Sequence, residues 1–341
     1  MLREALRCGL LAGAVLAGSG PPAEAQSKIV WDIAIYGPPR EITVPIETVA
    51  KYIDEKSGGN FTFKLHYSES IAPAKSVLDS LKIEAIQGGL VTFGYTPGKV
   101  PLHLAIDLPY LPIATLEQLQ KVQEAFNAWE PARQEMAKWN GISLYGVLLP
   151  VYEFMGTGKP PRTLEDWKGM RVRVLGTAGE AMKLLGAVPT SVSAPEVYTA
   201  LERGTFSAVA MPFTYALGAY KIYQVSKWYT VGMKLGAVNN AWVFSKSAYE
   251  KLPAEYKKLL EDVKAAQYAA GAAALRAADE KYVPLFDQAG LERVTITPEL
   301  AAALQAKAGQ PIWESWVKQN EAKGLPAREA LDLILKTAKG G

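Results

Sequence analysis

The chain alternates short apolar stretches with amphipathic ones, and this alternation constrains its fold more than any other feature. Strands are expected at 29–36, 61–67, 90–95 and 143–149, and helices at 44–57, 74–87 and from Leu116 to about Trp139. Glycine and proline punctuate the pattern, as in the turn 37–39 that follows the first strand. Strands that alternate with helices in this way predict an α/β fold.

A Gly/Pro-rich connection at 156–161 marks a change along the chain. Beyond it, strands are expected at 170–174, 188–192, 208–211 and 238–244, and helices at 178–185 and 196–203. An Ala-rich helical stretch at 253–289 is longer than most helices, and Pro284 is expected to kink it or end it early. A helix of that length could lie across two domains.

The strand at 170–174 carries two arginines. Successive side chains of a strand point to opposite faces, so Arg171 and Arg173 share one face and the apolar residues share the other. A guanidinium buried in a sheet covered on both faces is costly unless it is paired. Because an arginine fork fits a carboxylate, the strand predicts an anion site, with an internal ion pair to Asp or Glu as the alternative.

The first residues predict a secretory signal peptide. A basic start, a small and apolar run from Cys8 to Gly20, and an A-x-A site at 23–25 are its three parts. We expect the signal peptide to cover residues 1–25 and cleavage to follow Ala25; a disordered N-terminus is the alternative. Cys8 is the only cysteine, so the processed chain would contain neither a disulfide nor thiol chemistry.

Charge and hydropathy exclude two classes of partner. The formal net charge is +3, and no Lys/Arg block occurs, so we expect no nucleic-acid surface. No later apolar run has the length of a membrane span, so the mature protein is expected not to be membrane-inserted. We expect it to be a monomer.

No catalytic signature occurs in the sequence. The two histidines, His66 and His103, lie next to no second ligand and no patterned acid. There is no H-E-x-x-H, G-x-S-x-G or Walker motif, and no carboxylate cluster indicates a metal ion. Together with export, this favours a binding protein over an enzyme, with no cofactor and no metal. An exported hydrolase or lyase that uses carboxylates is the alternative.

Several motifs resemble one family in their order and spacing. These are DWKGMRVR at 166–173, GAVP at 186–189, EVYTALERG at 196–204 and the Met-Pro pair at 211–212, preceded by AIQGG at 85–89 and DLPYLP at 107–112. They are similar to motifs of the solute-binding proteins of TRAP (tripartite ATP-independent periplasmic) transporters, the DctP-like family. The resemblance extends over nearly the whole processed chain.

The resemblance implies a two-lobed periplasmic-binding-protein-like fold with a hinge and a long helix that spans both lobes. Lobe I is then expected at 27–149 plus about 237–262, lobe II at 150–236 plus about 290–335, and the bridging helix at 253–289. In that family the second arginine of the strand, here Arg173, clamps the ligand carboxylate. Arg171 stands where the family has lysine, and it either contacts the ligand or pairs with an acid.

The chain departs from the family pattern toward apolar residues, with Ala210 and Met211 in place of polar ones. Aromatic residues lie near the expected strand ends, namely Tyr36, Phe93, Tyr95, Tyr152, Phe154, Phe213, Tyr215 and Trp242. Their rings could stack on a flat ligand, although core packing is the alternative for each. Asn239 could add a polar contact, with a turn role as its alternative. The expected ligand-binding residues are Arg173, Arg171, Tyr36, Phe93, Tyr95, Phe154, Met211, Phe213, Asn239 and Trp242.

These expectations combine into one functional hypothesis. A periplasmic solute-binding protein captures an organic acid, preferably an aromatic monocarboxylate such as a hydroxycinnamate, and delivers it to TRAP membrane permease subunits. A C4-dicarboxylate is the second candidate ligand, and a 2-oxo acid is the third. A sensor kinase is the alternative partner to a transporter.

Overall fold

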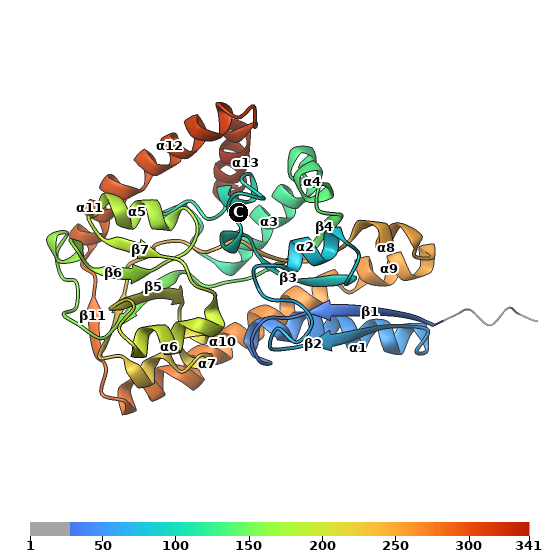
Figure 1. Ribbon diagram of the computed structural model, residues 1–341, viewed down its shortest axis with the longest axis horizontal. Helices are drawn as coiled ribbons and strands as arrows, with labels where there is room; N and C mark the ends of the chain where they lie inside the picture. The colour runs from blue at the N-terminus through green and yellow to red at the C-terminus, as the bar shows by residue number, and fades with distance from the viewer. Residues whose placement is uncertain (1–27, 341) are drawn as a thin grey trace, which may run out of the picture.

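The computed structural model describes residues 28–340 and contains two β-sheets that lie side by side, each covered by helices (Figure 1). The predicted signal peptide, with its cleavage after Ala25, lies outside the described residues. We call the half of the molecule built on the five-stranded sheet lobe I, and the half built on the six-stranded sheet lobe II.

Lobe I is built on a sheet of strand order β2-β1-β3-β10-β4. Its strands are β1 (Ile29–Ala34), β2 (Phe61–His66), β3 (Gly88–Thr92), β4 (Gly141–Val147) and β10 (Asn240–Ser245). β1 runs parallel to β2 and β3, whereas β10 is antiparallel to both β3 and β4. Gly88 of β3 leaves room for a side chain of the adjacent strand: a Cβ there would lie 2.7 Å from the Ile33 side chain of β1.

The helices of lobe I follow the predicted pattern with two changes. They are η1 (Glu41–Thr43), α1 (Val44–Ser57), α2 (Val77–Lys82), η2 (Phe93–Tyr95), η3 (His103–Ala105), α3 (Leu116–Ala128), α4 (Glu130–Ala137), α8 (Lys246–Lys251) and α9 (Ala254–Asp262). The bounds of α1 are those predicted, and Gly58 ends it in the left-handed region. Helix α2 is shorter than predicted. The long helix expected to reach Trp139 is divided into α3 and α4, because Trp129 adopts an extended backbone between them.

Lobe II is built on a sheet of strand order β11-β9-β5-β8-β6-β7. Its strands are β5 (Tyr152–Gly156), β6 (Arg171–Arg173), β7 (Val188–Thr190), β8 (Ala208–Pro212), β9 (Trp228–Val231) and β11 (Glu292–Thr295). β6 is parallel to β7 and β8, and β5 is antiparallel to β8 and β9. The short helices between them are η4 (Glu165–Trp167), α5 (Ala178–Leu184), η5 (Ala194–Glu196), α6 (Val197–Glu202), α7 (Tyr215–Ala219) and η6 (Ile222–Val225).

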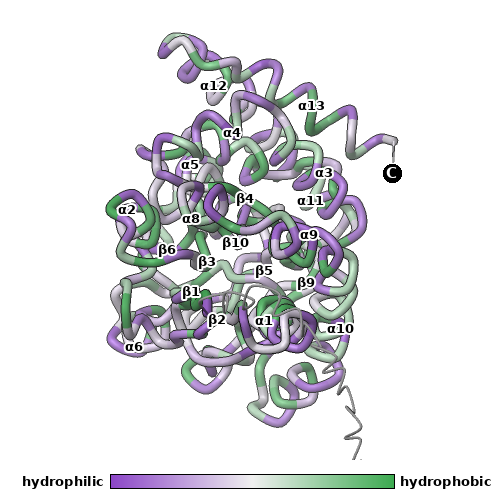
Figure 2. Tube along the Cα trace, turned by 90° about the vertical axis from the view of Figure 1, so that its right-hand side faces the viewer, coloured by the Kyte–Doolittle hydropathy of each residue, from purple (hydrophilic) through white to green (hydrophobic). Residues whose placement is uncertain are grey.

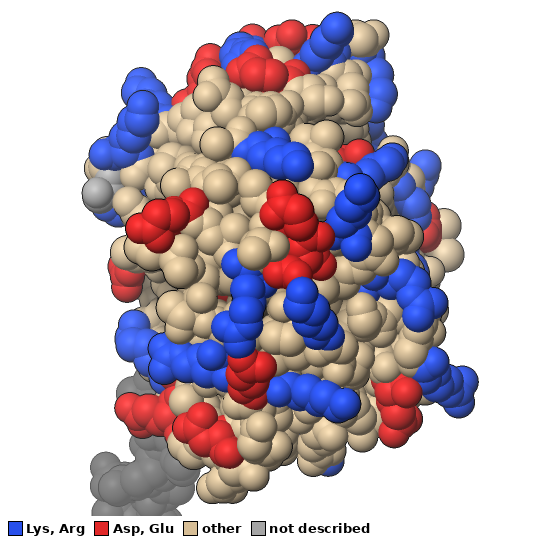
Figure 3. Space-filling model, turned by 90° about the vertical axis from the view of Figure 1, so that its left-hand side faces the viewer, with Lys and Arg blue, Asp and Glu red and all other residues tan. Residues whose placement is uncertain are grey.

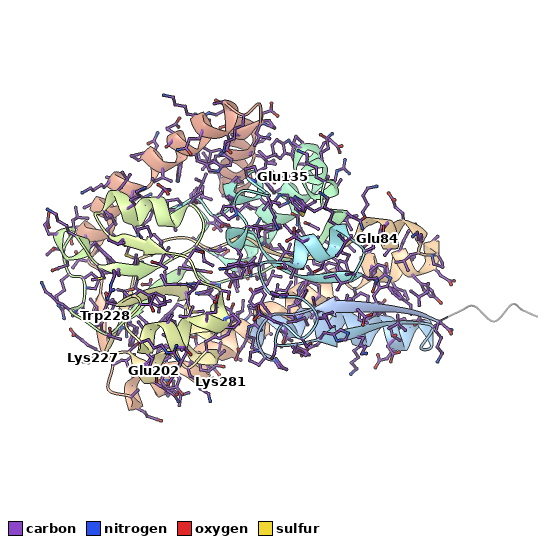
Figure 4. All side chains as sticks on the ribbon, viewed as in Figure 1. Glu84, Glu135, Glu202, Lys227, Trp228 and Lys281 are labelled. Atoms are coloured by element: carbon purple, nitrogen blue, oxygen red, sulfur yellow. The ribbon has the colours of Figure 1, made fainter. Side chains whose placement is uncertain are left out.

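A long helix, α10 (Lys264–Gln288), packs against α1 of lobe I and α7 of lobe II, so it runs along both lobes (Figure 1). The helical stretch expected at 253–289 is therefore two helices, α9 and α10, with Val263 between them. Pro284 lies inside α10 and does not end it. From the lobe II part of α10, Lys281 Nζ donates to Glu41 Oε1 at 3.1 Å, which ties the helix to lobe I (Figure 4).

Three C-terminal helices arch from lobe II back to lobe I (Figure 1): α11 (Pro298–Ala308), α12 (Gln310–Glu321) and α13 (Ala327–Lys339). α11 packs on α5, and α13 packs on α3, where Gln118 Nε2 donates to the Ala338 carbonyl at 3.1 Å. Hydrophobic and hydrophilic residues alternate along α13 (Figure 2), and its buried side chains form one face. The stretch expected in lobe II thus also contacts lobe I.

The surface carries both signs of charge. On the face shown in Figure 3, lysines and arginines are interspersed with acidic residues, without a large block of one sign. Among the helices of residues 28–340, none is long and apolar enough to span a membrane.

Candidate functional site

A narrow cavity of about 20 Å³ lies between the two lobes and is lined by both. Its walls are Tyr36, Arg40, Thr92, Tyr95 and Asn240 from lobe I, Tyr152, Arg173, Leu175, Ala194, Met211, Pro212, Tyr215, Ala216 and Tyr220 from lobe II, and Leu149 from a segment that crosses between them. Thr92, Arg173 and Pro212 are the last residues of their strands. The cavity therefore lies at the carboxyl ends of strands, where open α/β sheets bind ligands.

Arg173 is held rigidly in the wall of this cavity, with 1% of its surface exposed. Its Nε and Nη2 donate to the Val192 carbonyl at 3.1 and 2.8 Å, and Nη1 donates to the Ala210 carbonyl at 3.0 Å. All of these bonds go to neutral carbonyl oxygens, so they orient the guanidinium but leave its charge without a carboxylate. Three of the five N–H donors are used, and two remain for another acceptor.

A second guanidinium, that of Arg40, lines the same cavity and was not predicted from the sequence. It lies in the turn after β1, with its guanidinium carbon 5.0 Å from the centre of the Tyr36 ring and 5.4 Å from that of Tyr220. Its side chain is buried, yet it keeps its positive charge, because arginine does not lose its proton at accessible pH. The available signal was an arginine just beyond the carboxyl end of a strand.

Five tyrosines surround the two arginines: Tyr36, Tyr95, Tyr152, Tyr215 and Tyr220. Burial raises the pKa of Tyr95 and Tyr215 well above the ordinary value, so their hydroxyls stay neutral. Tyr36 Oη lies 2.6 Å from Thr92 Oγ1, and Tyr95 Oη accepts from the Ala194 amide at 2.8 Å. Tyr220 Oη is buried and has no hydrogen-bond partner among the described residues. The wall thus combines flat rings with hydroxyls that can donate to an anion.

The structure brings some of the predicted residues together and leaves others apart. Arg173, Tyr36, Tyr95 and Met211 line the cavity, as do Tyr152 and Tyr215 from the wider aromatic group. The other predicted residues do not line it: Arg171, Phe93, Phe154, Phe213, Asn239 and Trp242.

Those six residues have other contacts. Phe93 packs on His103, Phe154 on Trp167 and Phe213 on Tyr229, with ring centres 4.4, 4.7 and 5.9 Å apart. Trp242 is fully buried in the core of lobe I. Asn239 donates to the His103 carbonyl at 3.2 Å, and its neighbour Asn240 lines the cavity instead. Phe154 and Trp242 share a strand face with the lining residues Tyr152 and Asn240, but they lie two residues farther along the strand, inside the lobe.

Arg171 is exposed and donates to the Gly204 carbonyl at 2.8 Å. Arg171 is the first residue of β6 and Arg173 is the last, so the two lie roughly 6.6 Å apart along the strand. Only Arg173 is at the end that meets the cavity. A shared face therefore does not give Arg171 and Arg173 a shared environment.

The buried residue Asp107 connects the lobes through its backbone carbonyl. Asp107 Oδ1 accepts from the Asn239 amide at 2.5 Å, and the Asp107 carbonyl accepts from Thr177 Oγ1 of lobe II at 2.6 Å. Burial raises the pKa of Asp107 well above the usual range, only partly offset by the Asn239 amide. Gly176 is packed against it: a Cβ there would lie 2.5 Å from Asp107 Oδ2.

Both histidines have acidic partners that the sequence pattern did not indicate, and neither lines the cavity. His66 Nε2 lies 2.5 Å from Asp32 Oδ1, and His103 Nδ1 lies 2.7 Å from Glu135 Oε2. Glu135 also accepts two backbone amides, so this pair fixes a buried loop. Within residues 28–340, no group of three or more His, Cys, Asp or Glu side chains could hold a metal ion.

Comparison with known proteins gives a family for this arrangement. The family model DctP, bacterial extracellular solute-binding protein, family 7, matches residues 41–320. The uncharacterized protein YiiZ of Salmonella typhimurium is 26% identical over 215 residues; the match covers 62% of this chain and, at 65%, just under two thirds of that protein. The C4-dicarboxylate-binding periplasmic protein DctP of Rhodobacter capsulatus is 25% identical over 287 residues, 81% of this chain and 83% of that protein.

A solved structure of similar fold is a TRAP solute-binding protein from Rhodoferax ferrireducens in complex with copurified benzoate. Its TM-score is 0.83 at 18% identity, and the match covers 92% of this chain and 98% of that one. This likeness confirms the predicted two-lobed α/β fold with a long helix. The family match confirms the resemblance found in the sequence and the expectation of a binding protein, since the family consists of transport receptors and not of enzymes.

Proposed function

Because the chain belongs to family 7 of the bacterial extracellular solute-binding proteins, the TRAP solute-binding proteins, we propose that it captures its organic acid in the cavity between the lobes. Arg173 binds the carboxylate of that acid. The observation that carries the proposal is a buried, permanently charged guanidinium whose hydrogen bonds all go to carbonyl oxygens. Such a charge is stabilised by an anion that reaches its remaining donors.

The tyrosine walls support an aromatic acid as the ligand. The Tyr36 and Tyr95 rings meet edge to face with their centres 5.7 Å apart, and Met211 adds a soft apolar surface. A flat ring can pack against such walls while its carboxylate reaches Arg173. The sequence favours an aromatic monocarboxylate of the hydroxycinnamate type. Met211, Tyr36 and Tyr95 are the residues that we propose to contact the ring.

A C4-dicarboxylate is the second candidate, supported by one specific observation. Arg40 places a second positive charge on the cavity wall, and an aromatic monocarboxylate would neutralise only one of the two. The R. capsulatus relative is named for C4-dicarboxylates, whereas the R. ferrireducens structure contains benzoate. We find no structural observation that favours a 2-oxo acid.

We propose that the lobes close over the ligand about the segments that cross between the sheets. The crossing from β4 to β5 and the crossing from β9 to β10 hydrogen-bond to each other, since the Tyr152 amide donates to the Gly236 carbonyl at 2.8 Å. Gly232 and Gly236 both have positive φ there, which favours glycine. Hinges are typically a few such positions that absorb a change in backbone angles.

The proposed partners follow from the family. The processed chain would act in the periplasm after export and would deliver its ligand to TRAP membrane permease subunits. Lobe closure would present the surface that the permease recognises.

A thermal-shift panel on residues 26–341 tests this function. The candidate acids are benzoate, 4-hydroxycinnamate, succinate, fumarate and pyruvate. A ligand at ~100 times its dissociation constant adds about 2.7 kcal/mol of stability, which raises the melting temperature by several degrees. Shifts with the aromatic acids support the tyrosine-walled site. Shifts with succinate and fumarate alone favour the second candidate, and no shift with any acid contradicts the proposal.

A further inference from the structure

The turn at 37–40 fixes Arg40 so that one edge of its guanidinium is left for a ligand. Nη1 donates to the Tyr36 and Pro38 carbonyls, each at 2.8 Å, and these bonds use both of its N–H groups. Gly37 allows this approach, because its φ is +70° and a Cβ there would lie 2.9 Å from Arg40 Nη1. Nε and Nη2 are buried and have no hydrogen-bond partner among the described residues.

The geometry of that edge suits a carboxylate. In a guanidinium, the Nε–H and one Nη2–H point in parallel, so the two oxygens of a carboxylate can accept both at once. The side chain is 8% exposed and lines the cavity, so the two donors have little access to bulk water. Buried donors that lack an acceptor are costly, which indicates that an acceptor belongs there.

The charges that line the cavity also indicate that an anion binds there. Two guanidiniums line it, Arg173 from lobe II and Arg40 from lobe I, and no acidic side chain of the described residues is among its lining. An arginine cannot lose its charge at accessible pH, so burial cannot neutralise either one. The tyrosines that surround Arg40 are hydrogen-bond partners but do not compensate a full charge.

We propose that Arg40 is a second anion clamp and that the ligand is a compact dicarboxylate whose two acid groups bind Arg173 and Arg40. The inference rests on the proposed function and adds the number of charges on the ligand. Because the two arginines belong to different lobes, such a ligand connects the lobes directly.

Matched pairs of acids test the proposal by calorimetric titration of residues 26–341. Each pair shares a skeleton and differs by one carboxylate: benzoate with isophthalate or terephthalate, and butyrate with succinate. We expect at least one dicarboxylate to bind about 100-fold more tightly than its monocarboxylate partner. The pair with the larger difference identifies the skeleton as aromatic or aliphatic.

Substitutions assign that difference to Arg40. We expect Arg40→Gln to lower the affinity for the dicarboxylate by about 100-fold and to leave that for the monocarboxylate within about threefold. Arg40→Lys retains the charge without the fork, and it should restore part of the preference. Arg171→Gln is the matched control, because this exposed arginine does not line the cavity and its loss changes the net charge equally.

Three outcomes separate the inference from the function on which it rests. If monocarboxylates bind at least as tightly as their partners, the inference is overturned while the organic-acid function stands. If Arg40→Gln weakens both members of a pair by the same factor, Arg40 is a structural support between Tyr36 and Tyr220, and the inference is again overturned. If no acid binds the wild-type protein, both proposals fail.

Discussion

At the scale of single residues, the site shows that position along a strand decides the environment of a charge. Arg171 and Arg173 alternate with apolar residues on the same strand, yet one is exposed and the other is buried at the cavity. The sequence pattern predicts a shared face but not which end of the strand meets the second lobe. The family resemblance identified Arg173, whereas the only signal for Arg40 was its position just beyond the carboxyl end of β1.

Asp107 provides a prediction for this scale. Its pKa in the folded protein lies above that of the unfolded chain, about 3.9, because burial disfavours the charged form. The folded state therefore holds the proton more tightly. The stability that this group contributes is complete below about pH 4 and is lost as the pH rises toward the folded pKa. Asp107→Asn should remove this loss of stability at higher pH, because the amide does not titrate.

Urea unfolding of wild type and Asp107→Asn at pH 5 and pH 8 measures the effect. We expect the variant to gain stability relative to wild type as the pH increases. Other titrating groups cancel in the comparison. A difference in unfolding free energy that is equal at both pH values would contradict a raised pKa for Asp107.

At the scale of elements, short apolar runs between turn residues predicted the lobe I strands, and helical periodicity predicted α1. These patterns missed β5 and β9. All five residues of β5 are buried, but Glu153 near its start interrupts the apolar run that would have indicated a strand. The Glu153 carboxylate accepts from Thr230 Oγ1 at 2.6 Å and from the Gly232 and Met233 amides at 2.9 Å. Long-range partners of this kind leave no local pattern in the sequence.

The contact between α7 and α10 gives a prediction for this scale. A Cβ on Gly218 would lie 2.1 Å from the Tyr282 ring, so the two helices could not keep their separation. We expect Gly218→Ala to lower the free energy of unfolding by about 1–3 kcal/mol, the usual effect of overpacking.

Gly179→Ala in α5 is the control, because its Cβ would meet no atom closer than 3.9 Å. That substitution should be neutral or should stabilise by up to about 1 kcal/mol through helix propensity. Chemical denaturation of both variants decides the question. Equal effects at the two glycines would mean that Gly218 is not needed for the packing of α10.

At the scale of the whole molecule, the two lobes are connected by the crossing segments, by α10 and by the Asp107–Thr177 contact. The resemblance predicted the two lobes and the long helix. It could not predict that α13 returns to α3, because the residues that bind the two helices together are more than 200 positions apart.

The Asp107–Thr177 contact provides a prediction about lobe closure. Thr177→Val removes the hydroxyl that donates to the Asp107 carbonyl, and the loss of one such bond costs about 0.5–1.5 kcal/mol. If the contact stabilises the closed arrangement, ligand affinity should fall by roughly 2- to 13-fold. Thr163→Val, at an exposed site, is the control. An unchanged affinity in Thr177→Val would show that the contact is also made in the open arrangement.

The measurement that tests the central claim most directly is a calorimetric titration of Arg173→Gln beside Arg171→Gln, with the acid that gives the largest thermal shift. The account predicts that Arg173→Gln stays folded and loses at least about 30-fold in affinity, because a buried charge pair loses one partner. Arg171→Gln should bind within about twofold of wild type. Near-wild-type affinity in a folded Arg173→Gln variant would contradict the assignment of this cavity as the acid-binding site.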